Sequence, residues 1–153
     1  MGNINWARVL LGGLLAGVII DASEFVINAV ILKQDWADAL TKLNKPSELP
    51  TSSLAIFNVV GLVLGILAVW LYAAIRPRFG AGPKTAVNAA IAIWILGYLL
   101  PAAGQAAVGL IPLQPIEIAT GLGLIEIVIA SIAGAYVYKE ANAPAARSAA
   151  AGS

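Results

Sequence analysis

Four apolar stretches, each long enough to cross a bilayer as a helix, decide what this chain can fold into. They cover about residues 6–32, 52–75, 85–110 and 115–138. A helix needs about 20 mostly apolar residues to cross the hydrocarbon core of a membrane. Because lipid offers the backbone no hydrogen-bond partners, such stretches must be helical. The sequence therefore predicts an all-α integral membrane protein folded as a four-helix bundle.

The composition supports this interpretation and excludes several functions. Hydrophobic residues make up 60% of the chain and charged residues only 11%, whereas a soluble domain carries about 25% charged residues. The chain has no histidine and no cysteine, so the usual ligands of zinc, haem and iron–sulfur clusters and the usual nucleophile–base pairs are missing. We therefore expect no metal, no cofactor, no catalytic residues and no enzymatic activity. The net charge of +1 provides no basic surface for nucleic acid.

The domain organisation follows from the apolar stretches. We expect a membrane domain over residues 1–139 and an Ala-rich tail over residues 140–153 that is disordered or weakly helical unless it docks on a partner. The polar link after the first stretch contains Trp36, a candidate interfacial anchor, and its residues 36–43 could form a short surface helix. The first stretch is too long for a cleaved signal peptide, so we interpret it as a retained helix.

Basic residues predict the orientation, because cytoplasmic loops carry the excess of Lys and Arg. Six of them flank the amino terminus, the second link and the carboxyl terminus: Arg8, Arg76, Arg78, Lys84, Lys139 and Arg147. Both termini should therefore face the cytoplasm. The segment 76–84 combines glycines with cations but lacks the spacing of a phosphate-binding P-loop. We expect Arg76, Arg78 and Lys84 to contact the headgroups of anionic lipids instead.

Polar residues inside the apolar stretches are the best functional clues, because charges in hydrocarbon are costly. Asp21 and Glu24 lie in the first stretch and Glu126 in the fourth, and the middle of each stretch lacks Lys and Arg. At a rise of about 1.5 Å per residue, the three carboxyl groups come to a similar depth in the membrane. Together with Asn28 and Asn58, they form the predicted intramembrane polar cluster, on helix faces that we expect to turn inward.

Two roles remain open for this cluster. Carboxyl groups without a basic partner cannot all stay ionised in a medium of low dielectric constant, so we expect at least one of Asp21, Glu24 and Glu126 to carry a proton at neutral pH. The cluster could be structural, with a protonated carboxyl donating to an amide such as Asn58. It could equally be a working site for protons or cations.

Small residues and a proline predict how the helices pack and bend. The patterns Gly13-x-x-x-Gly17 and Gly61-x-x-x-Gly65 favour close helix contacts. Pro101 removes a helical hydrogen bond and Gly104 follows it, so the third helix should kink there. Trp94 and Tyr98 lie in the middle of the same helix, where core packing is favoured over stacking on a ligand such as a quinone.

Three stretches resemble a group of uncharacterised four-helix bacterial inner-membrane proteins. They are Asn5-Trp6 leading into a Gly-rich first helix that ends at Asp35-Trp36, then Trp70-Leu-Tyr-Ala-Ala-Ile-Arg-Pro-Arg-Phe-Gly80, and finally Trp94-Ile-Leu-Gly-Tyr-Leu-Leu-Pro101. The resemblance spans most of the chain short of the tail. It implies a multi-pass topology in the bacterial cytoplasmic membrane, and it assigns no catalytic or ligand-binding residues.

Two functions are consistent with these observations. The first is a small membrane protein without catalytic chemistry, which acts through packing as a homo-oligomer or as an accessory subunit of a larger membrane complex. The second is a proton- or cation-coupled transporter or channel for small solutes that uses Asp21, Glu24 and Glu126. The position of Glu126 distinguishes them: a lipid-facing carboxyl would point to a missing partner, and an interior carboxyl connected to water would point to transport.

Overall fold

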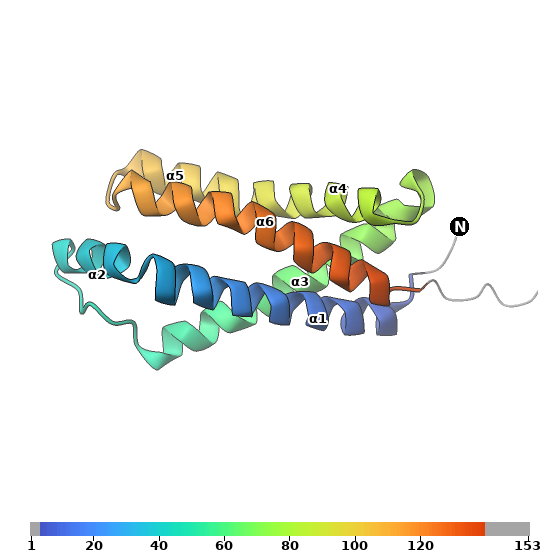
Figure 1. Cartoon of the computed structure of the whole chain (residues 1–153), viewed down its shortest axis with the longest axis horizontal. Helices are drawn as coiled ribbons and strands as arrows, with labels where there is room; N and C mark the ends of the chain where they lie inside the picture. Colours follow the sequence, from blue (N-terminus) through green and yellow to red (C-terminus); the bar gives the residue numbers. More distant parts are fainter. Residues whose placement is uncertain (1–3, 140–153) are drawn as a thin grey trace, which may run out of the picture.

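A computed structural model describes residues 4–139 of the chain as an assembly of helices (Figure 1). The elements in order are α1 (Trp6–Glu24), η1 (Phe25–Ile31), α2 (Lys33–Lys42), α3 (Thr51–Phe79), α4 (Pro83–Trp94), η2 (Ile95–Leu99), α5 (Leu100–Val108) and α6 (Leu113–Val137), where η denotes a π-helix. The all-helical prediction is confirmed for the described residues. The predicted tail, residues 140–153, lies outside them.

Within residues 4–139, four continuous helices are long and apolar enough to cross a membrane: Trp6–Ile31, Thr51–Phe79, Pro83–Val108 and Leu113–Val137. They coincide with the four predicted stretches, and the architecture is an all-helical one compatible with a membrane-spanning bundle. The largest difference is at the end of α3, which continues through Pro77 to Phe79. It ends at Gly80, whose φ of 87° lies in the region that glycine adopts without strain. The predicted short surface helix is also present, as α2.

Glycines hold α1 and α3 at close range, and this pair is the most extensive helix contact in the bundle. Gly13 and Gly17 of α1 lie directly against Gly65 of α3, backbone to backbone. Gly12 makes an equally close approach to Gly134 of α6. Helix α6 also packs on α4, and α4 on α3. Small residues therefore form the contact faces, as the sequence predicts, because only they let helix backbones approach this closely.

Aromatic residues join the two ends of the described chain at one end of the bundle. The Asn5 backbone N–H donates to the Tyr138 hydroxyl at 3.3 Å, and the Gly82 N–H donates to the Tyr72 hydroxyl at 3.3 Å. The two tyrosine rings form a T-shaped pair with centroids 6.0 Å apart. The Arg76 guanidinium lies 5.6 Å from the Tyr138 ring centroid. The first and last spans thus meet beside the α3–α4 turn (Figure 1).

Two π-helical segments interrupt the first and third spans. In η2, the Leu100 N–H donates to the Ile95 carbonyl, five residues back, immediately before Pro101, which has no N–H to donate. Gly104 lies within the regular helix α5, so the expected irregularity involves Pro101 but does not extend to Gly104. The η1 segment ends in the same way, with the Leu32 N–H donating to the Ile27 carbonyl at 2.9 Å. Its sequence contains no proline, and no pattern predicted it.

The first part of α3 diverges from the third and fourth spans. Nearly all side chains over residues 51–60 are exposed, and α5 packs against η2 and α6 rather than against α3. Figure 1 shows the start of α3 well apart from α5. At this end of the molecule, the bundle is therefore open between α3 and α5.

Candidate functional site

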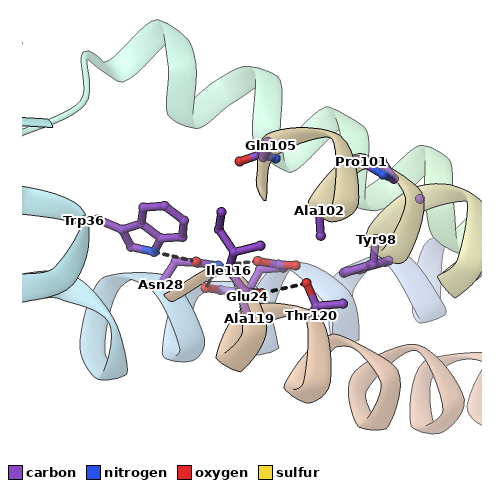
Figure 2. Close-up of a pocket in the computed structure, with 11 residues that line it drawn as sticks. Glu24, Asn28, Trp36, Tyr98, Pro101, Ala102, Gln105, Ile116, Ala119 and Thr120 are labelled. Carbon is purple, nitrogen blue, oxygen red and sulfur yellow. Dashed lines mark hydrogen bonds between the residues drawn. The ribbon is translucent and has the colours of Figure 1, made fainter. Parts of the chain in front are cut away.

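A pocket of about 180 Å³ lies in this open half, between the two π-helical segments (Figure 2). It is lined by Glu24, Asn28, Trp36, Gly97, Tyr98, Pro101, Ala102, Gln105, Ile116, Ala119 and Thr120. All spans except α3 contribute to this lining, together with α2. Departures from regular α-helix are frequent at functional sites, because they redirect side chains out of the regular helical register.

Three side chains on one wall of the pocket form a hydrogen-bonded row. The Trp36 indole N–H donates to the Asn28 Oδ1 at 2.9 Å. The Asn28 amide in turn donates to a carboxylate oxygen of Glu24 and to the Glu24 backbone carbonyl at 3.1 Å. Figure 2 shows Glu24 between Trp36 and Tyr98 in the pocket. The row fixes the Glu24 carboxyl group at the pocket surface.

Tyr98 connects the pocket with Glu126 in the bundle core. Its ring lines the pocket, and its hydroxyl donates to the Glu126 Oε1 at 2.6 Å. The ring lies directly on Gly123 of α6: a Cβ atom at that position would be 2.6 Å from a ring carbon of Tyr98. Gly123 therefore provides the space that lets Tyr98 reach Glu126, one helical turn further along α6.

Glu126 is the buried carboxyl group of the site. The residue is 3% exposed, and its Oε2 has no hydrogen-bond partner among the described residues. The charges of Glu24 and Asp21 act on it electrostatically. Salt bridges to this carboxyl are absent from the part of the chain that the structure describes, so only the Tyr98 hydroxyl compensates its polarity. An enclosed carboxyl with so few partners is expected to hold a proton rather than a charge.

The structure brings most of the predicted polar cluster together but separates two members from its centre. Glu24, Asn28 and Glu126 lie at or beside the pocket. Asp21 points toward α3, where its carboxyl oxygen touches Gly61. Asn58 is exposed, and its amide donates to the Leu54 carbonyl of its own helix at 2.8 Å. The expected hydrogen bond between a carboxyl group and Asn58 is therefore absent, because α3 diverges from the bundle at this depth.

Sequence reasoning missed the roles of Trp36 and Tyr98. Trp36 was expected to be an interfacial anchor, and Tyr98 to pack in the core. Each also uses its polar atom on the site, in keeping with the tendency of buried Trp and Tyr to find hydrogen-bond partners. Trp94 does pack in the core, with its indole N–H donating to the Thr120 carbonyl at 2.9 Å. The sequence did offer one signal for this role. Tyr98 lies in the middle of an apolar stretch, where its hydroxyl group needs a hydrogen-bond partner.

The three predicted headgroup contacts separate into two kinds. Arg78 and Lys84 are exposed at the α3–α4 turn, and their contact with lipid headgroups stays a prediction. Arg76 is half-buried and contacts the Tyr138 ring, so it also takes part in joining the ends of the bundle.

A metal centre is not supported by the geometry. Within residues 4–139, no group of three or more Asp, Glu, His or Cys side chains is arranged to hold a metal ion. The carboxyl groups of Asp21, Glu24 and Glu126 point to different neighbours, as described above.

Comparisons with protein-family models, with curated proteins and with solved structures find no match to this chain. The assignment of a function therefore depends on the pocket and on Glu126.

Proposed function

We propose that this protein is a proton-coupled carrier or channel for small solutes, with Glu126 as its proton-binding group. The observation that carries the proposal is the enclosed Glu126 carboxyl, whose Oε1 accepts from Tyr98 while its Oε2 has no partner in the described chain. Ionisable residues at such positions in membrane proteins commonly mark proton or ion pathways. No catalytic activity is part of this proposal.

The pocket supports the proposal by supplying a route for protons. Glu24 and Tyr98 both line it, and both interact with Glu126, by charge and by hydrogen bond respectively. A proton arriving at the pocket therefore finds a carboxyl group at the surface and a hydroxyl that leads to the buried carboxyl. Glu126 is interior and linked to the pocket through Tyr98, an arrangement that supports transport over simple packing.

The setting of this function is also a proposal. The resemblance to bacterial inner-membrane proteins and the basic residues at one end of the bundle favour a cytoplasmic membrane with both termini inside. In that orientation, the exposed cations Arg78 and Lys84 contact anionic headgroups of the inner leaflet. The pocket then lies in the opposite, outward half of the membrane.

Proton flux in liposomes tests the proposal. We expect wild-type protein to dissipate an imposed pH gradient faster than empty liposomes, directly if it is a channel and in the presence of the exchanged solute if it is a carrier. Potassium and valinomycin are present to prevent a membrane potential. Glu126→Gln keeps the shape but cannot release a proton, so its flux should fall to the level of empty liposomes. The matched control is Glu117→Gln, because Glu117 lies on the same helix but is exposed; its flux should be unchanged. Equal fluxes for wild type and Glu126→Gln would refute the assignment.

A second function, assembly into a homo-oligomer, is favoured by Asn58. This residue places a polar amide on an exposed, otherwise apolar face of α3. Its side chain bonds only within its own helix among residues 4–139. An amide in hydrocarbon gains about 0.6 kcal/mol from an interhelical hydrogen bond, and pairing with Asn58 of a second copy would supply one.

Native electrophoresis in mild detergent tests this assembly. We expect a dimer or larger species for wild type and a clear shift toward monomer for Asn58→Leu, because leucine removes the amide and keeps the apolar surface. Asn88→Leu serves as the control, since Asn88 is also exposed but lies on α4. A strictly monomeric wild type, or the same distribution for both variants, would contradict homo-oligomer formation.

A further inference from the structure

We propose that the pocket binds a small organic ammonium ion with a single flat apolar group, and that this cation is the solute exchanged for the Glu126 proton. The inference rests on the proposed function and deepens it by naming the substrate class. Three features of the pocket carry it: the sign of its charge, its aromatic walls and its size.

The charge of the pocket favours a cation. Glu24 is the ionisable acid in the lining, and the lining contains no Lys or Arg. Asn28 holds the Glu24 carboxyl in place, so binding an ammonium group there requires little rearrangement. The second carboxyl, Glu126, is hydrogen-bonded to Tyr98 of the lining and becomes negative when it releases its proton. An anion would meet only repulsion from these groups, because no described cation lies at the pocket.

The walls of the pocket suit a flat apolar body beside that cation. Trp36 and Tyr98 lie on either side of Glu24 (Figure 2), and aromatic faces attract ammonium groups by cation–π interaction. Ile116, Ala102 and Ala119 complete the apolar part of the lining. A metal ion or a bare proton would make no use of these aliphatic and aromatic surfaces.

The size of the pocket limits the ligand. Its volume of about 180 Å³ is below the range of about 300–1,000 Å³ that holds drug-sized molecules. It therefore fits a single ring with a short aminomethyl arm better than a polycyclic cation. The absence of Lys and Arg from the lining argues against amino acids, whose carboxylate would lack a cationic partner there.

Tyr98 links the two events. It lines the pocket and also donates to Glu126, so a ligand that displaces its ring also changes the environment of the buried carboxyl. Entry of one ammonium ion and departure of one proton from Glu126 to water leave the net charge of the site unchanged. The geometry thus permits exchange of one cation for one proton without an additional uncompensated charge in the membrane core.

A matched set of ring compounds tests the ligand class. Benzylammonium, benzyl alcohol and benzoate have similar shapes and carry a positive charge, no charge and a negative charge. Binding to the full-length protein in lipid nanodiscs is measured by titration calorimetry and by tryptophan fluorescence. Trp36→Phe identifies the part of the signal that comes from the pocket. We expect saturable binding of benzylammonium, and at least tenfold weaker binding of the other two compounds.

Variants at Glu24 complete the test. Glu24→Gln removes the charge-assisted hydrogen bond to the ammonium group, so it should weaken benzylammonium binding by about tenfold or more. Glu24→Asp, which keeps the charge, should retain most of the binding, and the exposed Glu117→Gln should retain all of it. Equal binding of benzylammonium and benzyl alcohol would overturn the inference. So would unchanged binding in a Glu24→Gln protein that still elutes as a single species.

The two proposals fail in different ways. Proton flux in wild-type liposomes without benzylammonium binding would overturn the ligand class and leave Glu126 as the proton site. Charge-selective benzylammonium binding without any Glu126-dependent proton flux would overturn the coupled function. In that case, the pocket would remain a cation-binding site.

Discussion

Replacing Gly65 with alanine is expected to separate α1 from α3 and to destabilise the whole bundle. A methyl group on Gly65 would lie 2.5 Å from the Gly13 carbonyl oxygen and 2.6 Å from the Gly17 Cα. These are backbone atoms of a neighbouring helix, which cannot rotate away as a side chain would. Overpacking in cores typically costs about 1–3 kcal/mol, and here we expect the upper end of that range. Reversible unfolding in bicelles by added dodecyl sulfate measures the change.

The control for this variant is Gly104→Ala in α5. A Cβ atom at Gly104 meets nothing within 4 Å, and alanine in a helix is more favourable than glycine by about 0.5–1 kcal/mol. Gly104→Ala should therefore leave stability unchanged or raise it slightly, while Gly65→Ala lowers it. Similar effects from the two substitutions would show that the α1–α3 contact is not as close as the structure describes.

Replacing Gly123 with alanine is expected to break the hydrogen bond between Tyr98 and Glu126. The new methyl group would lie 2.6 and 2.8 Å from two carbons of the Tyr98 ring, so the ring must move away from α6. Glu126 would then lose the only hydrogen-bond partner it has in the described chain. Leaving a buried polar group without a partner costs about 1–3 kcal/mol. Proton flux should also fall, because the hydroxyl no longer connects the pocket to Glu126.

Gly121→Ala, two residues earlier on the same helix, is the matched control. Gly121 is exposed, and a Cβ atom there meets nothing within 4 Å. Ultraviolet difference spectra of the tyrosines, together with unfolding and proton-flux measurements, distinguish the two variants. Gly123→Ala should change all three. Gly121→Ala should leave the spectra and the flux unchanged and should leave stability unchanged or raise it slightly. Normal flux in a folded Gly123→Ala protein would exclude Tyr98 as the link to Glu126.

The positions of the spans were predictable, because each depends on a local property of the sequence. An apolar stretch of sufficient length predicts a helix wherever it lies, and the charged links between stretches mark the ends. The glycine patterns were equally informative: Gly13, Gly17, Gly61 and Gly65 all lie at the contact between α1 and α3. Pattern alone also correctly predicted that Glu126 is interior.

The composition of the site was less predictable, because it depends on the directions of the helix axes. Helical periodicity placed Asn58 on the same face as Gly61 and Gly65. That face does meet α1, but Asn58 lies beyond the closest contact, on the exposed part of α3. Conversely, Trp36 was assigned to a surface helix, and the short turn after η1 returns it to Asn28. Neither outcome can be derived from spacing within a single helix.

The sequence by itself determined the number of long apolar helices, the all-helical class and the burial of an acidic group in the core. Hydrophobicity and the cost of unpaired backbone groups in lipid act on each segment separately, so they can be evaluated one segment at a time. Only the tertiary structure decided which polar side chains meet. Two π-helical segments shift the register of the first and third spans, and the divergence of α3 leaves a pocket between them. Which side chains these features bring together depends on how the helices pack, so Tyr98 and Trp36 could be joined to Glu126 and Glu24 only after the helices were placed together.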